Sequence, residues 1–72
     1  MNWKQVAGNW LQFRGIIREQ WTKLTEEHLD FIGGNRELLI GRIRQLYGMS
    51  QDQTEKQVTA WTKRVTAPAH VK

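Results

Sequence analysis

The sequence predicts an all-α domain of four short helices that pack as two crossed helical hairpins. Three observations support this prediction. Apolar residues recur at helical spacing, capping motifs divide the chain into helix-length segments, and residues 8–21 have a near copy at residues 34–47. No segment shows the apolar–polar alternation that is typical of a half-buried strand. With 72 residues the chain is long enough for one domain.

The first helical segment follows from an apolar stripe near the N-terminus. Its residues recur in alternating steps of three and four, missing only at Gln20, as one face of a helix requires: Trp3, Val6, Trp10, Phe13, Ile17 and Leu24. The motif Asn-x-x-Gln stands at both 2–5 and 9–12, and each copy resembles a capping box. The helix therefore either begins at Trp3 and continues, or breaks at Gly8 and restarts at Trp10.

A second helix is predicted after Thr25, whose hydroxyl can accept a free backbone N–H. Glu26 and Glu27 complement the positive helix end, and Gly33-Gly34 ends the segment.

Asn35 is predicted to cap a third helix that runs to Tyr47 and stops at Gly48. Ser50-x-x-Gln53 is a capping box that opens the fourth helix. Residues 1–65 form the predicted domain, and residues 66–72, which contain the one proline, form a predicted flexible tail.

The repeat fits the pattern G-N-x5-G-x-I-R-x2-aromatic in both copies, 26 positions apart. An internal duplication of this kind implies two similar hairpins, each of which needs the other to bury its apolar face. The matching pairs are Gly8 and Gly34, Asn9 and Asn35, Gly15 and Gly41, Ile17 and Ile43, Arg18 and Arg44, and Trp21 and Tyr47.

The predicted core is rich in aromatic residues. The chain has no cysteine for cross-links, but it has four Trp, two Phe and one Tyr. Each buried aromatic removes about 150–250 Å² from water, so these rings can replace disulfides as a source of stability. The residues assigned to the core are Trp3, Trp10, Phe13, Trp21, Leu39, Ile43, Tyr47, Val58 and Trp61.

Gly15 and Gly41 interrupt predicted helices, where glycine costs about 1 kcal/mol relative to alanine. Both lie opposite the apolar face of their helix. Close packing of another backbone against them is the favoured explanation, and a docking surface is the alternative.

The net charge of +4 comes entirely from residues 31–72, because acids and bases cancel in residues 1–30. A basic half suggests an anionic partner, although a solvated surface explains the same charge. The residues that could contact a nucleic-acid backbone are Arg14, Arg18, Arg42, Arg44, Lys63 and Arg64. Aromatic residues do not alternate with these cations, so stacking platforms for single strands are not indicated.

No catalytic, cofactor or metal site is indicated. Ser50 is better explained as a helix cap than as a nucleophile, and His28 and His70 are far apart in sequence. Glu26 and Asp30 are one turn apart, but acids are common at a helix N-terminus. The sequence therefore predicts a non-enzymatic protein that is a monomer or a weak oligomer, with a protein or nucleic-acid partner.

No secretory signal is recognisable, and the longest aliphatic run, residues 38–40, is far too short to span a membrane. We therefore expect a cytoplasmic protein. A third interpretation is binding to a membrane surface through the Trp-rich first helix, but a small domain needs that apolar face for its core.

The chain resembles the CsbD-like family of small bacterial stress-response proteins from Asn2 to about Lys63. The resemblance rests on the order and spacing of Trp10, Phe13, Gly15, Trp21, Leu24, Thr25, Glu26, Glu27, Gly34, Gly41, Ile43, Tyr47 and Gly48. One departure is Thr22, where the family often has glycine. The resemblance implies a SAM-domain-like pair of orthogonal hairpins and a cytoplasmic role in general stress. It implies no enzymatic activity, ligand or site residues.

Overall fold

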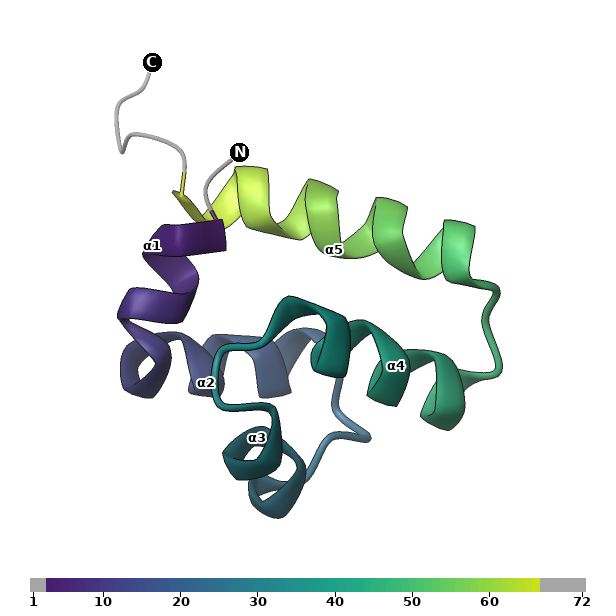
Figure 1. Ribbon diagram of the computed structural model, residues 1–72, viewed down its shortest axis with the longest axis horizontal. Helices are drawn as coiled ribbons and strands as arrows, with labels where there is room; N and C mark the ends of the chain where they lie inside the picture. The colour runs from purple at the N-terminus through teal and green to yellow at the C-terminus, as the bar shows by residue number, and fades with distance from the viewer. Residues whose placement is uncertain (1–2, 67–72) are drawn as a thin grey trace.

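The computed structural model describes residues 3–66, and this part of the chain is helical with no strand. Figure 1 shows the order of its helices. They are α1 (Trp3–Gly8), α2 (Trp10–Gln20), α3 (Glu26–Ile32), α4 (Arg36–Tyr47) and α5 (Gln51–Thr66). The all-helical prediction is confirmed. Thr66, assigned to the tail, is the last residue of α5, and residues 67–72 lie outside the described residues.

The prediction of four helices is wrong, because the first segment breaks after Gly8. The Asn9 side chain does not cap α2. Its Nδ2 instead donates to the Gln5 carbonyl at 3.0 Å, and its backbone N–H donates to the same carbonyl at 3.1 Å. Asn9 thus ends α1 rather than opening α2 with a capping box. The alternative capping motif at 2–5 includes Asn2, which lies outside the described residues.

The other predicted helix boundaries are confirmed by cap geometry. Thr25 Oγ1 accepts the His28 N–H at 3.1 Å, and Asn35 Oδ1 accepts the Leu38 N–H at 3.1 Å. Gly33 and Gly48 end α3 and α4 with φ of 54° and 64°, in the left-handed region that favours glycine.

The fourth predicted helix, α5, begins with the expected reciprocal capping box. The Gln53 N–H donates to Ser50 Oγ at 3.1 Å, and the Ser50 N–H donates to Gln53 Oε1 at 3.4 Å.

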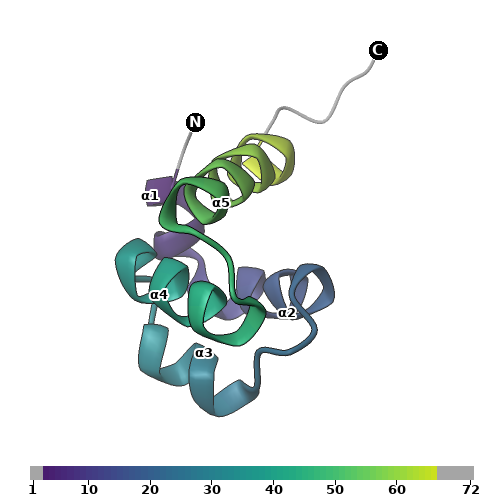
Figure 2. The same ribbon diagram turned by 90° about the vertical axis from the view of Figure 1, so that its right-hand side faces the viewer.

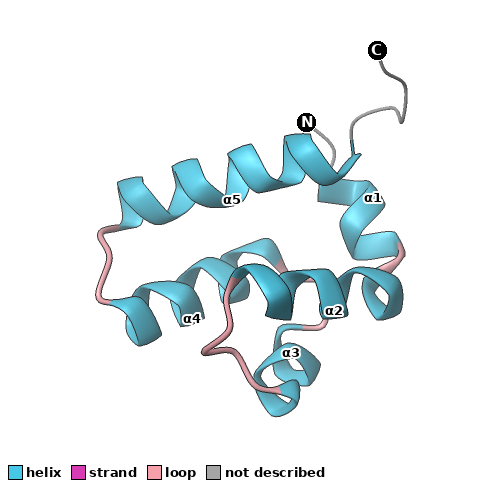
Figure 3. Cartoon of the chain, turned by 180° about the vertical axis from the view of Figure 1, so that it is seen from behind, coloured by secondary structure: helices cyan, strands magenta, loops and turns pink. Residues whose placement is uncertain are grey.

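The helices pack around one core with α4 and α5 as an antiparallel hairpin (Figures 1 and 3). α3 runs across α2 and packs mainly against α4, as the turned view in Figure 2 shows. α1 lies across the C-terminal end of α5. The second half therefore forms the hairpin that the repeat predicts. In the first half α2 and α3 cross each other and do not form a matching antiparallel hairpin. The SAM-domain-like arrangement of two orthogonal hairpins therefore stays a prediction.

Aromatic rings fill the centre of this core. Trp61 of α5 lies 5.6 Å from Trp21 and 6.4 Å from Phe13, centroid to centroid, the latter in an edge-to-face contact. Six of the nine residues assigned to the core are buried: Phe13, Trp21, Leu39, Ile43, Val58 and Trp61. The other three, Trp3, Trp10 and Tyr47, are partly buried and pack against this cluster. Each of these three side chains has a polar group that forms a hydrogen bond at the edge of the core: the indole N–H groups donate, and the Tyr47 hydroxyl accepts the Lys23 N–H at 3.1 Å.

Two tryptophans near the N-terminus form hydrogen bonds to backbone carbonyls far along the chain. Trp3 Nε1 donates to the Gly34 carbonyl at 2.9 Å, and Trp10 Nε1 donates to the Leu29 carbonyl at 3.1 Å. Gly34 has a φ of +91°, and a Cβ there would meet Ala7 of α1 at 3.4 Å. Gly34 is thus the glycine at which another backbone approaches closely, whereas its repeat partner Gly8 has nothing within 4 Å of a Cβ position.

Candidate functional site

Gly15 and Gly41 occupy equivalent exposed positions in the middle of α2 and α4. A Cβ added at either glycine would meet nothing within 4 Å. The expectation that another backbone packs against them is therefore wrong. Both helices turn Ile17 and Ile43 into the core, which leaves the glycines on the outer side. The open space at both glycines is compatible with the alternative, a docking surface.

Gly41 forms part of a groove between α4 and α5, which we call the α4–α5 groove. Its walls carry charged and amide side chains, and Ile40, only 5% exposed, lies at its base. The lining residues are Arg36, Glu37, Ile40, Gly41, Arg44, Gln51 and Glu55. A side chain at position 41 would enter this space, so the glycine keeps the groove open.

Hydrogen bonds hold the α5 wall of this groove in place. Arg44 Nη1 donates to Gln51 Oε1 at 3.3 Å, and Gln51 Nε2 donates to Glu55 Oε2 at 2.8 Å. Arg36 Nη2 donates to Thr59 Oγ1 of α5 at 2.9 Å. The groove is therefore a polar surface of nearly balanced charge, suited to a partner that offers charges of both signs.

The equivalent surface on α2, which we call the α2 hollow, is lined by Gly15, Arg18, Glu19 and Thr22. In both copies an arginine three positions after the bare glycine borders the hollow. The repeat thus places the same pair, glycine and arginine, at two separate surfaces.

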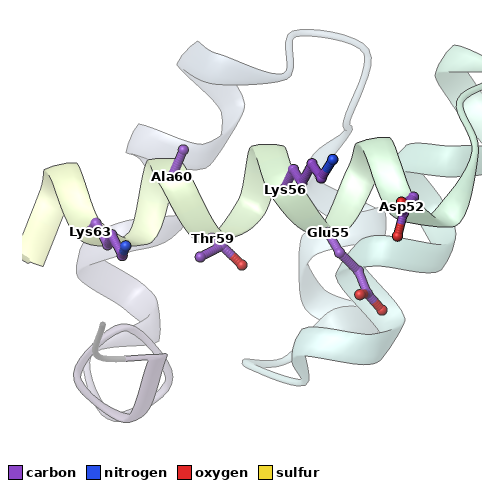
Figure 4. A pocket seen from close by; sticks show the side chains of 6 residues that line it. All are labelled: Asp52, Glu55, Lys56, Thr59, Ala60 and Lys63. Atoms are coloured by element: carbon purple, nitrogen blue, oxygen red, sulfur yellow. The ribbon is translucent and has the colours of Figure 1, made fainter.

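Another hollow follows the outer side of α5, but its side chains do not converge. Figure 4 shows Lys56 and Ala60 pointing to one side of the helix and Glu55 and Thr59 to the other. The remaining lining residues are Asp52 and Lys63. Because a single helix supplies all of them, the hollow is an open surface between side chains.

The two arginines of α2 that were assigned to anion binding are engaged with acids of α3. Arg14 Nη1 lies 2.9 Å from Asp30 Oδ1, and Arg18 Nη1 lies 3.1 Å from Glu26 Oε2. These pairs join the crossing helices α2 and α3. Glu26 and Asp30 each form an ion pair with an arginine of α2 and do not act together as a pair of carboxylates.

The other four assigned cations are spread over α4 and α5. The Arg42 guanidinium carbon lies 5.8 Å from the ring centroid of Phe31, and its Nη1 donates to Gln45 Oε1 at 3.0 Å. Arg64 Nη2 donates to Gln20 Oε1 of α2 at 3.0 Å. Arg44 borders the α4–α5 groove and Lys63 the outer side of α5. The six cations therefore come from three helices, α2, α4 and α5.

His28 has a structural partner that sequence reasoning missed. Its Nδ1 accepts the Thr25 N–H at 3.2 Å and completes a capping box at the start of α3. The signal was its position three residues after Thr25, where glutamate or glutamine usually makes this bond. Within residues 3–66 no three His, Asp or Glu side chains lie close enough together to hold a metal ion.

The exposed apolar residues were also missed. Leu11 on α2 is 81% exposed and Phe31 on α3 is 64% exposed, whereas Trp3 and Trp10 pack against the core. The tryptophans of the first helical segment are therefore not free to insert into a membrane surface, as that interpretation requires. No helix in the described part of the chain has the length and apolar character needed to cross a bilayer.

Comparison with known proteins finds close relatives in several bacteria. The UPF0337 protein YjbJ of Escherichia coli O6:H1 is 47% identical over 64 residues, which cover 89% of this chain and 93% of that protein. The YjbJ protein of Salmonella typhimurium is 45% identical over 64 residues, covering 89% and 91%. The UPF0337 protein RPA4217 of Rhodopseudomonas palustris is 46% identical over 61 residues, covering 85% and 92%. No family model and no solved structure matches the chain.

Proposed function

This chain belongs to the UPF0337 family, and we propose that it is a non-enzymatic binding protein that docks partners on the α4–α5 groove and the α2 hollow. The observation that carries the proposal is the bare environment of Gly15 and Gly41. Each glycine costs helix stability and relieves no clash in the isolated fold. Residues that lower the stability of a fold without a structural reason are typical of functional sites.

The surroundings of the polar side chains support a non-enzymatic role. Ser50 and His28 are used in helix caps, and Glu26 and Asp30 are paired with arginines. A catalytic nucleophile needs a base within hydrogen-bond reach. Each of these four side chains instead forms a helix cap or an ion pair. The names of the relatives include no enzymatic activity.

The motif resemblance adds the biological setting. The spacing of the tryptophans, glycines and the Thr25-Glu26-Glu27 segment supports placement in the CsbD-like group, and with it a cytoplasmic role in general stress. This setting is tested by comparing the survival of a bacterial strain that produces this protein with that of a strain that lacks it, under osmotic, acid and oxidative stress. Equal survival of both strains in every condition contradicts it.

The docking role is tested by capturing partners from stressed cells with the wild-type chain and with Gly15→Gln and Gly41→Gln. Glutamine is compatible with a helix, so these variants should fold while filling the bare surfaces. A matched control is Ala60→Gln on the exposed outer side of α5. We expect the glycine variants, and not the control, to lose a defined partner. Recovery that is unchanged in every variant contradicts the proposal.

Weak, sequence-independent nucleic-acid binding is the second candidate, because the whole net charge of +4 lies in residues 31–72. The ion pairs of Arg14 and Arg18 reduce the cations available for phosphates. If this candidate holds, nuclease treatment should remove the captured material and affinity should fall steeply with salt. Substitution of Lys63 and Arg64 should then weaken binding to all sequences alike.

A further inference from the structure

We propose that the α4–α5 groove binds a second copy of this chain, with the two α4 helices antiparallel and related by a two-fold axis at Gly41. The inference rests on the docking role proposed for this groove and names its occupant. It follows from the arrangement of charge about Gly41 and from the open space at this glycine.

The charges on this face are complementary to themselves. Glu37 precedes Gly41 by four residues and Arg44 follows it by three. At about 1.5 Å rise per residue, these side chains stand about 6 Å and 4.5 Å from the glycine along the helix axis, in opposite directions. A two-fold axis through Gly41 therefore brings Glu37 of each copy beside Arg44 of the other, which is the pattern of an isologous interface.

Neither the Glu37 carboxylate nor the Arg44 guanidinium pairs with an opposite charge within residues 3–66. Among the described residues the Glu37 carboxylate has no ion-pair or hydrogen-bond partner, and Arg44 contacts the neutral amide of Gln51. Glu37 and Arg44 are about 10 Å apart along one helix, since about 1.5 Å separates successive residues, so they do not pair in the monomer. Dimerisation would form two such pairs at once.

The bare glycine allows the close approach that these pairs require. A Cβ at position 41 would meet nothing within 4 Å, so the facing helix can approach to about 8 Å, the lower end of ordinary interhelical distances. Gln51 and Glu55 of α5 form the groove wall beside it. The contact is polar and small, which predicts a weak dimer whose association falls with salt.

The α2 hollow lacks this symmetry. Leu11 and Gln12 precede Gly15 by one turn, whereas both charged residues, Arg18 and Glu19, follow it. Antiparallel pairing of two α2 helices would place each charge opposite an uncharged side chain. A second copy therefore fits the α4–α5 groove and not the α2 hollow, which makes α2 a matched control.

Sedimentation velocity from micromolar to millimolar protein at low salt tests the proposal with exchanged charges. Glu37→Arg and Arg44→Glu should each weaken dimerisation roughly tenfold, since two exposed attractive pairs become repulsive. The double variant recreates both pairs with reversed signs and should restore the wild-type dissociation constant. Gly41→Gln should abolish the dimer, and Gly15→Gln should leave it unchanged. Far-UV circular dichroism of each variant confirms the fold.

A chain that remains monomeric at millimolar concentration and low salt overturns the proposal. So does a dimer that the charge exchanges do not weaken, or one that Gly15→Gln disrupts and Gly41→Gln does not. Glu37→Arg alone decides the matter if Arg44→Glu fails to fold. Monomeric protein whose captured partner is still lost in Gly41→Gln would refute the second copy and leave the docking role standing.

Discussion

Alanine at positions 15 and 41 should stabilise the isolated domain. Both glycines lie inside helices, and the added Cβ meets no atom within 4 Å, so no packing loss opposes the gain in helix propensity. Each substitution should raise the free energy of unfolding by about 0.5–1 kcal/mol. Gly15 and Gly41 are in different helices and share no neighbours, so the double variant should gain about 1–2 kcal/mol. In a domain of this size, each 1 kcal/mol corresponds to about 4–8 °C in Tm.

Thermal and urea unfolding followed by circular dichroism measure this gain, in dilute solution so that self-association does not contribute. Gly34→Ala is the control, because Gly34 has a φ of +91° and a Cβ added there would lie 3.4 Å from the Cα of Ala7. That substitution should lower the Tm. If Gly15→Ala or Gly41→Ala also lowers the Tm of the monomer, then something does pack against these positions and the argument for docking faces loses its basis.

Three further substitutions probe the core, a cap and an ion pair. Trp61→Ala should lower the free energy of unfolding by about 3–5 kcal/mol, because Trp61 is only 2% exposed. Trp10→Ala should lower it by less, because Trp10 is only partly buried, and equal urea midpoints for the two variants would contradict this ranking. Ser50→Ala removes the hydroxyl that accepts the Gln53 N–H and should cost about 1 kcal/mol in the same assay, and an unchanged midpoint would argue against the cap. Asp30→Asn should cost less than about 1 kcal/mol, because the side chain is 68% exposed, and a larger loss in thermal unfolding would show that its ion pair matters more than its exposure suggests.

Helix caps were the most predictable part of the fold because they depend on residues that are close in sequence. Thr25, Asn35 and Ser50 each bond an N–H three residues ahead, so a short motif contains both partners. Asn9 has the same kind of motif ahead of it but bonds backward to Gln5. An asparagine side chain can end one helix or open the next, so the motif alone does not decide between the two.

The candidate site was harder to predict because it depends on where helices cross. The sequence showed that Gly15 and Gly41 lie opposite the apolar faces, but a bare helix surface is compatible with either a crossing backbone or solvent. The same limit applies to the charges. Sequence alone does not show that Arg14 and Arg18 are paired, because the acids that they contact, Asp30 and Glu26, come from another helix.

The contacts that α5 makes with the N-terminal half of the chain should decide when the domain can fold during its synthesis. Helices α1 and α5 lie at opposite ends of the sequence yet side by side in space (Figure 1), and α5 supplies Trp61 to the rings of Phe13 and Trp21. A nascent chain whose α5 is still inside the ribosome has no closed core. Truncation before Trp61 should therefore leave the apolar faces of the earlier helices exposed to water, and proteases should digest the truncated chain faster than the full chain. We therefore expect this domain to fold as one unit, and only after α5 has been synthesised.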